Sequence, residues 1–274
     1  MLKELSIEDI HECTLDLIVK LDKLCSEIGV KYYVMYGSLI GAIRHKGFIP
    51  WDDDFDVIMM RPDYDRFVAY CREHQAELMP LKLLNKDTTD NYPYNISRFS
   101  DTSYRMEKEG VSDTEMGLFI DVYVFDGIGN DPQAAVKKLA RKKKIYNLCT
   151  YFSYYKVKDA TNKGFAYQIT KNILFLYAKN KSPYVFFKKF DKLAGLYDYD
   201  SSEYIGEIVW DSYITPFRKE WFADTVRVPF ESIEVPVPVG YDQVLHAEYG
   251  DYMQLPPEDK RVPSHFYKLY KVED

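Results

Sequence analysis

Apolar residues recur at helical spacing along the first thirty positions of the chain. Ser6 and Asp9 form a capping-box pattern with Asp in place of the usual Glu, and Gly29 ends the run. Between them the apolar residues fall every three or four positions, on one face of a helix: Ile7, Ile10, Leu17, Ile18, Leu21, Leu24, Cys25 and Ile28. The pattern therefore predicts an amphipathic helix up to about residue 28.

After this helix the pattern changes to short apolar runs separated by glycine and proline. Residues 31–36 predict a buried strand that ends at a turn formed by Gly37 and Ser38. The next elements are predicted in this order: a brief helix over 39–44, a loop over 46–53, a strand over 54–60 and a helix that begins at 61–63.

Apolar side chains fill both faces of the segment 117–126, the best of two or three strands expected between residues 80 and 126. Asp121 lies in the middle of this segment. A carboxylate in such an apolar strand is costly unless it is paired or binds a metal ion. Asp121 is therefore a candidate functional residue, whereas Asp126 at the strand end is interpreted as a turn or capping residue.

The rest of the chain divides by composition. Residues 131–200 predict helices dense in lysine and aromatic residues, inserted between residues 1–130 and 201–274. The last part predicts short strands, proline-rich turns over 235–240 and a small helix over 241–249. Together the elements predict an α/β (α+β) core, a mixed sheet flanked by helices, with a helical basic and aromatic insertion.

Composition narrows the class of protein. The 274 residues are 46% apolar, and no window reaches the ~18 to 20 unbroken apolar residues of a membrane span. The first residues lack a basic-then-apolar signal pattern, so the expected compartment is the cytoplasm. The four cysteines form no C-x-x-C pair, so a zinc site is not expected and a disulfide framework has no support.

The net charge of −7 hides a strong asymmetry. Residues 131–192 hold 15 Lys and Arg against 3 Asp and Glu, and the remaining residues hold 21 against 40. A basic lobe in an acidic protein favours an anionic partner. The run from Lys137 to Lys144 is interpreted either as a solvated helix face or as a contact for the acceptor or a membrane, and nucleic acid is disfavoured.

The segment 36–56 concentrates the chemistry. Asp54 and Asp56 alternate at the start of the predicted strand, so both carboxylates would share a face. Oxygen-only ligands at this spacing suit Mg²⁺, with Asp121 as the natural third carboxylate. The alternative for Asp121 is an ion pair with Arg98 or Arg105. Backbone N–H groups at a Gly–Ser turn before a helix suit a bound phosphate.

With these residues in view, the chain resembles the LicD/fukutin family of phosphotransferases, which have a nucleotidyltransferase fold. The resemblance covers roughly residues 5–126 and 201–265. It is carried by these stretches: Tyr36-Gly-Ser-Leu-Ile-Gly-Ala-Ile-Arg44, His45-Lys-Gly-Phe-Ile-Pro-Trp-Asp-Asp-Asp-Phe-Asp56, Met60-Arg-Pro-Asp-Tyr64, the strand with Asp121, Phe217-Arg-Lys-Glu-Trp-Phe222, Val239-Gly-Tyr-Asp242 and Tyr249-Gly-Asp-Tyr-Met253.

The resemblance implies transfer of a phospho-alcohol, typically phosphocholine, from a CDP-activated donor to a hydroxyl of a cell-surface glycan precursor, with release of CMP. The acceptor would be a teichoic acid, lipopolysaccharide or capsule, reached from the cytoplasm, where the protein would lie free or peripherally at the inner face of the membrane. Mg²⁺ would be the cofactor and CDP-choline or another CDP-alcohol the donor. The expected metal ligands and catalytic residues are Asp54, Asp56 and Asp121.

The remaining site residues are expected to hold phosphate and nucleotide: Gly37, Ser38 and Gly41 as the cradle, Arg44 as a forked donor, Lys46 and Arg218 as further cations, and Asp52 as a supporting or capping residue. Trp51 could stack on cytosine, but a core-anchoring role is favoured. Nucleotide binding, acceptor binding and closure of the fold all stay open for residues of the tail: Tyr249, Asp251, Lys260, Arg261 and His265.

Two alternatives use the same residues differently. One is nucleotidyl transfer from an NTP with release of pyrophosphate. The other is a non-enzymatic glycan- or membrane-binding protein on a degenerate core, although the intact carboxylates speak against it. The aromatic lobe could form a cage for the quaternary ammonium of choline, a sugar-stacking surface or ordinary core.

Overall fold

The structure is a computed structural model, which describes residues 4–90, 92–107, 116–155, 165–210, 213–262 and 267–272. The chain forms two compact units. The first unit comprises residues 1–125 and 217–274, and the second comprises residues 126–216. Residues 131–200, which the sequence predicts as an inserted lobe, lie in the second unit.

A mixed sheet of seven strands organises the fold, as the sequence predicts. Its main path runs in the order β1-β2-β6-β4-β3. On this path β2 and β6 are parallel, and the other pairs are antiparallel. The strands of the sheet are β1 (Tyr33–Val34), β2 (Asp56–Met60), β3 (Leu81–Leu84), β4 (Ser97–Asp101), β6 (Leu118–Gly129), β7 (Tyr204–Glu207) and β8 (Phe217–Arg218).

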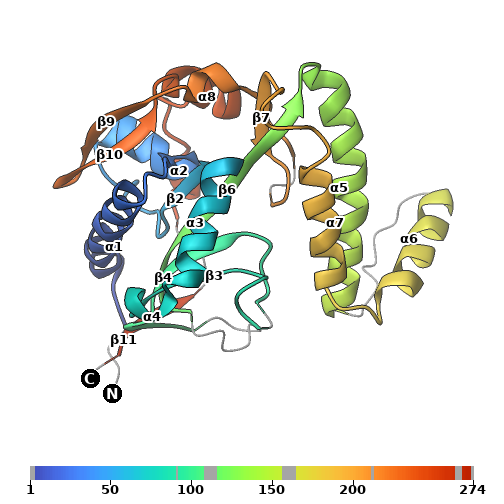
Figure 1. The fold of residues 1–274 in the computed structure, drawn as a ribbon, viewed down its shortest axis with the longest axis horizontal. Helices are drawn as coiled ribbons and strands as arrows, with labels where there is room; N and C mark the ends of the chain where they lie inside the picture. Colours follow the sequence, from blue (N-terminus) through green and yellow to red (C-terminus); the bar gives the residue numbers. More distant parts are fainter. Residues whose placement is uncertain are drawn as a thin grey trace. The chain divides into compact units, whose positions relative to one another are not determined.

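Two smaller antiparallel pairs complete the strands of the described residues. One is the hairpin of β9 (Thr225–Phe230) and β10 (Ile233–Pro238), and the other joins β5 (Tyr104–Glu107) to β11 (Lys268–Lys271). Glu4 forms an isolated bridge with Tyr270, so the two ends of the chain lie together (Figure 1).

Helices flank the sheet (Figure 1). In chain order they are α1 (Ile7–Glu27), α2 (Tyr36–Ile40), the π-helix η1 (Gly41–His45), α3 (Arg61–Glu73), α4 (Gln75–Leu78), α5 (Pro132–Tyr155), α6 (Phe165–Ala178), α7 (Tyr184–Ala194), the 3₁₀-helix η2 (Lys219–Phe222), α8 (Tyr241–Tyr249) and the 3₁₀-helix η3 (Glu258–Lys260). Among the described residues, no helix combines the length with the apolar character that a membrane crossing needs.

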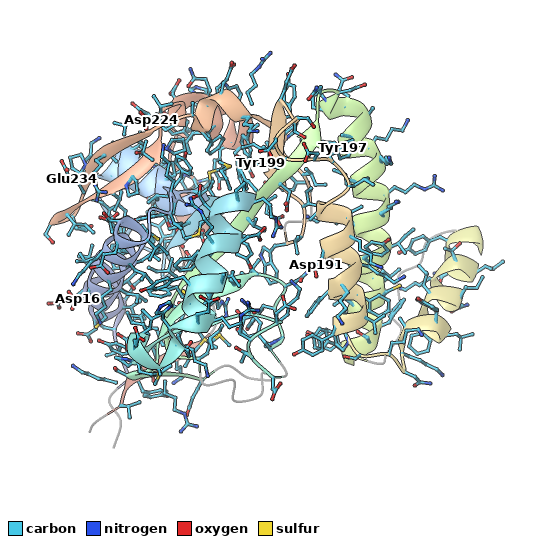
Figure 2. The ribbon with its side chains drawn as sticks, in the orientation of Figure 1. Asp16, Asp191, Tyr197, Tyr199, Asp224 and Glu234 are labelled. Carbon is cyan, nitrogen blue, oxygen red and sulfur yellow. The ribbon has the colours of Figure 1, made fainter. Side chains whose placement is uncertain are left out.

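The first predicted helix is confirmed together with its cap. Ser6 Oγ accepts a hydrogen bond from the backbone N–H of Asp9, and the carboxylate of Asp9 accepts one from the backbone N–H of Ser6. The apolar stripe of α1 is buried. Arg227 of β9 donates to both carboxylate oxygens of Asp22, at 3.1 and 2.9 Å, and so ties the β9–β10 hairpin to α1. Asp224 and Glu234 mark this hairpin in Figure 2.

The sequence misplaced several boundaries. The strand predicted over 31–36 contains only Tyr33 and Val34, because the helix begins already at Tyr36, whose φ of 55° turns the chain sharply. Between residues 80 and 126, the described part of the chain contains four strands, of which β6 runs on to Gly129, where the sequence predicts two or three. The proline-rich segment predicted as turns forms β10 over Ile233–Pro238, where prolines are tolerated because the strand pairs on one side with β9.

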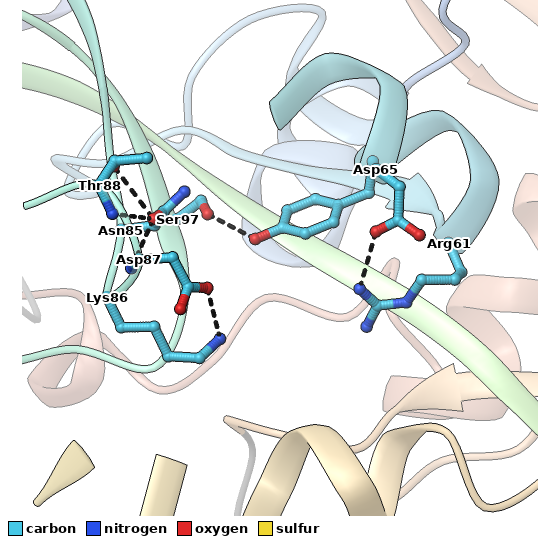
Figure 3. Close-up of polar contacts among 8 residues, drawn as sticks. Arg61, Asp65, Asn85, Lys86, Asp87, Thr88 and Ser97 are labelled. Atoms are coloured by element: carbon cyan, nitrogen blue, oxygen red, sulfur yellow. Dashed lines mark hydrogen bonds and ion pairs between the residues drawn. The ribbon is translucent and has the colours of Figure 1, made fainter. Parts of the chain in front are cut away.

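Polar contacts anchor α3 beside the sheet. The hydroxyl groups of Tyr64 and Ser97 lie 2.7 Å apart and join α3 to β4. Figure 3 shows this contact next to the loop in which Asn85 Oδ1 accepts the N–H of Thr88 at 2.9 Å. Since Ser97 directly precedes Arg98 on β4, the contact also helps to set the position of Arg98 beside Asp121.

In the second unit, a buried ion pair interrupts the basic run of α5. Lys143 Nζ lies 3.3 Å from Glu207 Oε2 of β7, and both side chains are almost fully buried. Glu207 also accepts hydrogen bonds from the N–H groups of Val209 and Trp210. The segment from Lys137 to Lys144 is therefore not a uniform solvated face, because Lys143 points into the interior.

Candidate active site

Three carboxylates converge at one end of the parallel strand pair. Asp56 is the first residue of β2 and lies opposite Asp121 of β6 in the strand register. Asp54 lies two residues before β2, in the loop that leads into the strand. One oxygen from each carboxylate lies within 4.8 Å of the others. The structure thus brings together the three acids that the sequence singled out as metal ligands.

Phe55, which lies between Asp54 and Asp56, explains why their carboxylates converge. Phe55 is fully buried, and its carbonyl accepts a hydrogen bond of 3.0 Å from the N–H of Asp121. Its neighbours Asp54 and Asp56 are therefore directed away from that core position. The sequence prediction placed Asp54 inside the strand, which is wrong, although the pairing of Phe55 with β6 extends the strand-like geometry to it.

Helix α2 holds the start of β2 through Ser38. The hydroxyl oxygen of Ser38 accepts a hydrogen bond of 2.9 Å from the N–H of Asp56, and both residues are buried. Gly37 and Ser38 lie inside the first turn of α2 and not in a turn before it. A Cβ atom at Gly37 would lie 2.8 Å from Asp52 Oδ2, so the absence of a side chain lets Asp52 approach the helix.

Gly41 allows a second close approach, between η1 and the loop that follows it. A Cβ atom at Gly41 would lie 2.5 Å from the carbonyl oxygen of Gly47, which is backbone and has little freedom to move. At Gly47 an added Cβ would overlap the carboxylate of Glu231. Glu231 in turn accepts the N–H of Phe48 at 3.1 Å. The tip of the β9–β10 hairpin thus fixes the loop that leads to the carboxylates.

Replacing Gly41 by alanine is therefore expected to lower the free energy of unfolding by about 1–3 kcal/mol, the usual cost of forcing an extra group into a packed site. Urea denaturation measures this change. Gly195→Ala is the matched control, because its Cβ would meet only Asp191 O at an ordinary 3.6 Å. Equal stability of the two variants would contradict the role assigned to Gly41.

Arg98 neutralises part of the negative charge of the cluster. Its Nε donates to Asp121 Oδ1 at 2.6 Å, and both side chains are buried. The guanidinium is stacked between two rings, 4.1 Å from the centroid of Tyr94 and 4.0 Å from that of Phe119. Burial lowers the pKa of Arg98, but the charge of Asp121, the hydrogen bond to it and the nearby Tyr92 and Tyr94 together outweigh burial and raise the pKa, so Arg98 stays cationic.

Both sequence interpretations of Asp121 therefore apply at once. Asp121 belongs to the carboxylate cluster, and it is also the acid paired with Arg98. Arg105, the other proposed partner, instead lies 3.6 Å from Glu107 on β5.

Tyr267 joins the site from the C-terminal part of the chain. Its hydroxyl donates to the carbonyl of Asp53 at 2.8 Å, and its ring packs 5.6 Å from that of Phe119. Burial raises the pKa of Tyr267, and the negative charges of Asp53, Asp54 and Asp121 raise it further. Sequence reasoning missed this residue, because nothing in its local pattern connects it to a loop more than two hundred positions earlier.

The predicted cations lie in three different settings. Arg44 donates from Nη1 to the carbonyl oxygens of Tyr252 at 2.7 Å and Gln254 at 3.3 Å. Lys46 is exposed and has a left-handed backbone with φ 62°. Arg218 is half exposed on β8, and its Nη1 lies 3.7 Å from Glu220. Only Arg44 is built into the interior of the fold.

His45 is poorly suited to carry a proton at neutral pH. It accepts a hydrogen bond of 3.0 Å from Nε of Arg44. Burial lowers the pKa of His45, and the charge of Arg44 lowers it further. His265, which follows the family pattern, lies outside the described residues.

The donor set fits a hard divalent cation. Three carboxylate oxygens close together are the ligands that Mg²⁺ or Mn²⁺ takes, whereas thiolate or imidazole ligands would favour zinc. Arg98 offsets only one of the three negative charges, so a net negative site is left. The cluster is therefore suited to a metal ion that also binds phosphate oxygens of a substrate.

Comparison with known proteins agrees with the family resemblance seen in the sequence. Residues 29–136 match the model of the LicD/FKTN/FKRP nucleotidyltransferase domain. The chain is 31% identical over 281 aligned residues to the lipopolysaccharide cholinephosphotransferase LicD of Haemophilus influenzae, covering 98% of this chain and 99% of the relative. A 45-residue stretch is 42% identical to an uncharacterised protein of Rickettsia typhi, covering 16% of this chain and 15% of that protein.

Proposed function

The chain belongs to the LicD/FKTN/FKRP family, as its motifs predict, and from this premise we propose that it transfers phosphocholine from CDP-choline to a hydroxyl of a lipopolysaccharide glycan. The products are the phosphocholine-modified glycan and CMP. The observation that carries this proposal is the convergence of Asp54, Asp56 and Asp121 within 4.8 Å of one another. A relative that matches almost the whole chain and is named a lipopolysaccharide cholinephosphotransferase supports the reaction class.

The chain's own residues hold and orient the reacting groups. Asp54, Asp56 and Asp121 would hold Mg²⁺, which would supply positive charge to diphosphate oxygens and to the leaving CMP. Ser38 fixes the start of β2 through its hydrogen bond to Asp56 and can donate its own hydroxyl proton to a phosphate oxygen. Arg98 holds Asp121 in place from the opposite side.

The transfer breaks the bond between the choline-bearing phosphorus and the bridging oxygen of CDP-choline, and it forms a bond from that phosphorus to the acceptor oxygen. The acceptor hydroxyl loses its proton, which a carboxylate of the cluster can accept; Asp54 is the candidate, because it is the least buried of the three. Positioning and electrostatic stabilisation carry most of the catalysis in reactions of this kind.

The alcohol carried by the donor is best identified by binding. A thermal-shift panel of CDP-choline, CDP-ribitol, CDP-glycerol and CDP-ethanolamine, each with and without Mg²⁺, tests the proposal. We expect CDP-choline with Mg²⁺ to give the largest stabilisation, since a ligand that binds only the folded state stabilises it more as the ratio of ligand concentration to Kd rises. A larger shift with another alcohol would reassign the donor, and teichoic acid or capsule would then become the acceptor to test.

The acceptor is lipid-linked, and we propose that the second unit contacts the anionic face of a membrane from the cytoplasm. Between residues 165 and 192 the sequence holds six lysines and one aspartate. Helix α6 also exposes Ile169, Ile173 and Leu176 on the side opposite its buried residue Lys171. Exposed apolar residues on a helix, followed in the chain by a lysine-rich segment, favour contact with an anionic membrane surface.

Ile173→Glu is expected to lower binding to phosphatidylglycerol vesicles about tenfold. The substitution removes an apolar side chain that would insert into the membrane, and it adds a negative charge. Vesicle sedimentation measures the bound fraction, with phosphatidylcholine vesicles for comparison. Val19→Glu, at an exposed apolar position on α1, is the matched control. Equal binding of the two variants would rule out α6 as the contact.

A further inference from the structure

A pocket of about 430 Å³ opens beside the helix that begins with α2 and continues as η1. This helix contributes Ile40 and Arg44 to its wall. The facing wall comes from Trp51 in the loop before β2, from Tyr249 at the end of α8 and from the segment after α8, which includes Asp251. All of these residues belong to the first unit.

Two guanidinium groups are held by neutral partners here: Arg44 lines the pocket, and Arg261 lies behind its wall, against Trp51. Arg44 donates to the carbonyl oxygens of Tyr252 and Gln254. Arg261 donates from Nε to the carbonyl of Pro256 at 3.0 Å, and its guanidinium carbon lies 5.8 Å from the ring centroid of Trp51. Among the described residues, neither arginine forms an ion pair with a carboxylate. Two positive charges positioned in this way favour an anionic ligand.

The aromatic walls add a preference for a flat ligand. Trp51 and Tyr249 both line the pocket, and Trp51 is half-buried instead of anchoring the core as the sequence suggests. Aromatic rings combined with arginines bind nucleotides, because the rings stack on the base and the arginines contact phosphate. Asp251 supplies a carboxylate that can accept a hydrogen bond from a ribose hydroxyl.

The pocket lies within reach of the carboxylate cluster. Trp51 precedes Asp54 by three residues, so their Cα atoms are at most about 11 Å apart. Ser38, which is hydrogen-bonded to Asp56, precedes Arg44 by six helical residues, or about 9 Å along the helix axis. A donor whose choline-bearing phosphate lies at the carboxylates can therefore place its CMP half, which includes the other phosphate, between Arg44, Trp51 and Arg261.

We infer that this pocket binds the CMP half of the activated donor, and that Arg261 and Trp51 determine its affinity. The inference rests on the proposed phosphotransfer and names where that reaction's nucleotide is held. It also assigns a role to the tail residues Tyr249, Asp251 and Arg261. The choline end of the donor is left on the other side of the diphosphate.

Calorimetric titration with CMP in the presence of EDTA tests the inference without requiring turnover. Arg261→Gln is expected to weaken CMP binding about tenfold, the effect of losing a charge-assisted hydrogen bond. Trp51→Leu is expected to weaken CMP binding but to leave inorganic phosphate binding unchanged, because phosphate has no base to stack. Lys260→Gln is the matched control, since it removes one positive charge at the exposed neighbour of Arg261.

Unchanged CMP affinity in both Arg261→Gln and Trp51→Leu, with melting temperatures like that of the wild type, would overturn the inference. Failure of the wild-type protein to bind CMP, or competition of phosphocholine for the same pocket, would overturn it as well. If the variants lose CMP affinity while the wild type transfers no phosphocholine, the pocket stands and the proposed function fails. If transfer occurs while the variants keep full CMP affinity, the function stands and the pocket fails.

Discussion

Asp56→Asn is expected to lower the rate of phosphocholine transfer from CDP-choline by on the order of 10²–10³ while the fold is retained. Asp56 is buried at the start of β2, opposite Asp121, and contributes one of the three clustered carboxylates. Asparagine has nearly the same shape and keeps the backbone hydrogen bond to Ser38. The substitution therefore removes negative charge from the metal site and leaves the packing unchanged.

The rate is measured as CMP formed per enzyme at saturating Mg²⁺, together with the melting temperature. Asp16→Asn is the matched control, because Asp16 is an exposed acid on α1 (Figure 2) and has no place in the cluster. A rate within twofold of the wild type for Asp56→Asn would exclude this carboxylate from the site. A large loss of rate in Asp16→Asn would show that any change of charge is harmful, and the test would then give no support to the cluster.

Arg98→Met is expected to lower the free energy of unfolding by about 3–5 kcal/mol in the absence of divalent metal, because it leaves the buried Asp121 carboxylate without its ionic partner. Methionine keeps an apolar side chain between the rings of Tyr94 and Phe119, so loss of packing contributes little. Added Mg²⁺ is expected to restore part of this loss, since a cation in the cluster replaces the missing positive charge and binds only the folded state.

Urea denaturation with EDTA measures the loss of stability, and the same measurement with Mg²⁺ gives the part that the metal restores. Arg105→Met serves as the control, because Arg105 is half exposed on β5 and its ion pair with Glu107 lies at the surface. The account requires Mg²⁺ to stabilise Arg98→Met more than it stabilises the wild type. Equal stabilisation of the two proteins by Mg²⁺ would show that Arg98 does not share the charge of the metal site.

Local patterns were enough to predict the three carboxylates. Asp54 and Asp56 are recognisable because they flank an aromatic residue just before an apolar strand. Asp121 is recognisable because it interrupts an apolar strand. Parallel pairing of β2 with β6 then places them together, which is the expected consequence of two buried strands that carry acids at the same end. Helix α8 was predicted with its observed bounds for the same reason, since its signals are local.

Contacts between distant segments could not be predicted in this way. The stacking of Arg98 between Tyr94 and Phe119 depends on the antiparallel pairing of β4 with β6. The contact of Tyr267 with Asp53 depends on the path of the C-terminal segment. The change from α2 to the π-helix η1 depends on the close approach of Gly41 to Gly47. In each case the cause lies in tertiary packing and leaves no periodic signal in the sequence.

The most direct test of the account is product analysis of the wild-type protein incubated with CDP-choline and lipopolysaccharide that lacks phosphocholine. CMP and phosphocholine-modified glycan are expected to form in equal amounts with Mg²⁺, and neither is expected to form with EDTA. Release of pyrophosphate from an NTP in place of CMP from CDP-choline, or CMP formation at an equal rate with EDTA, would contradict it.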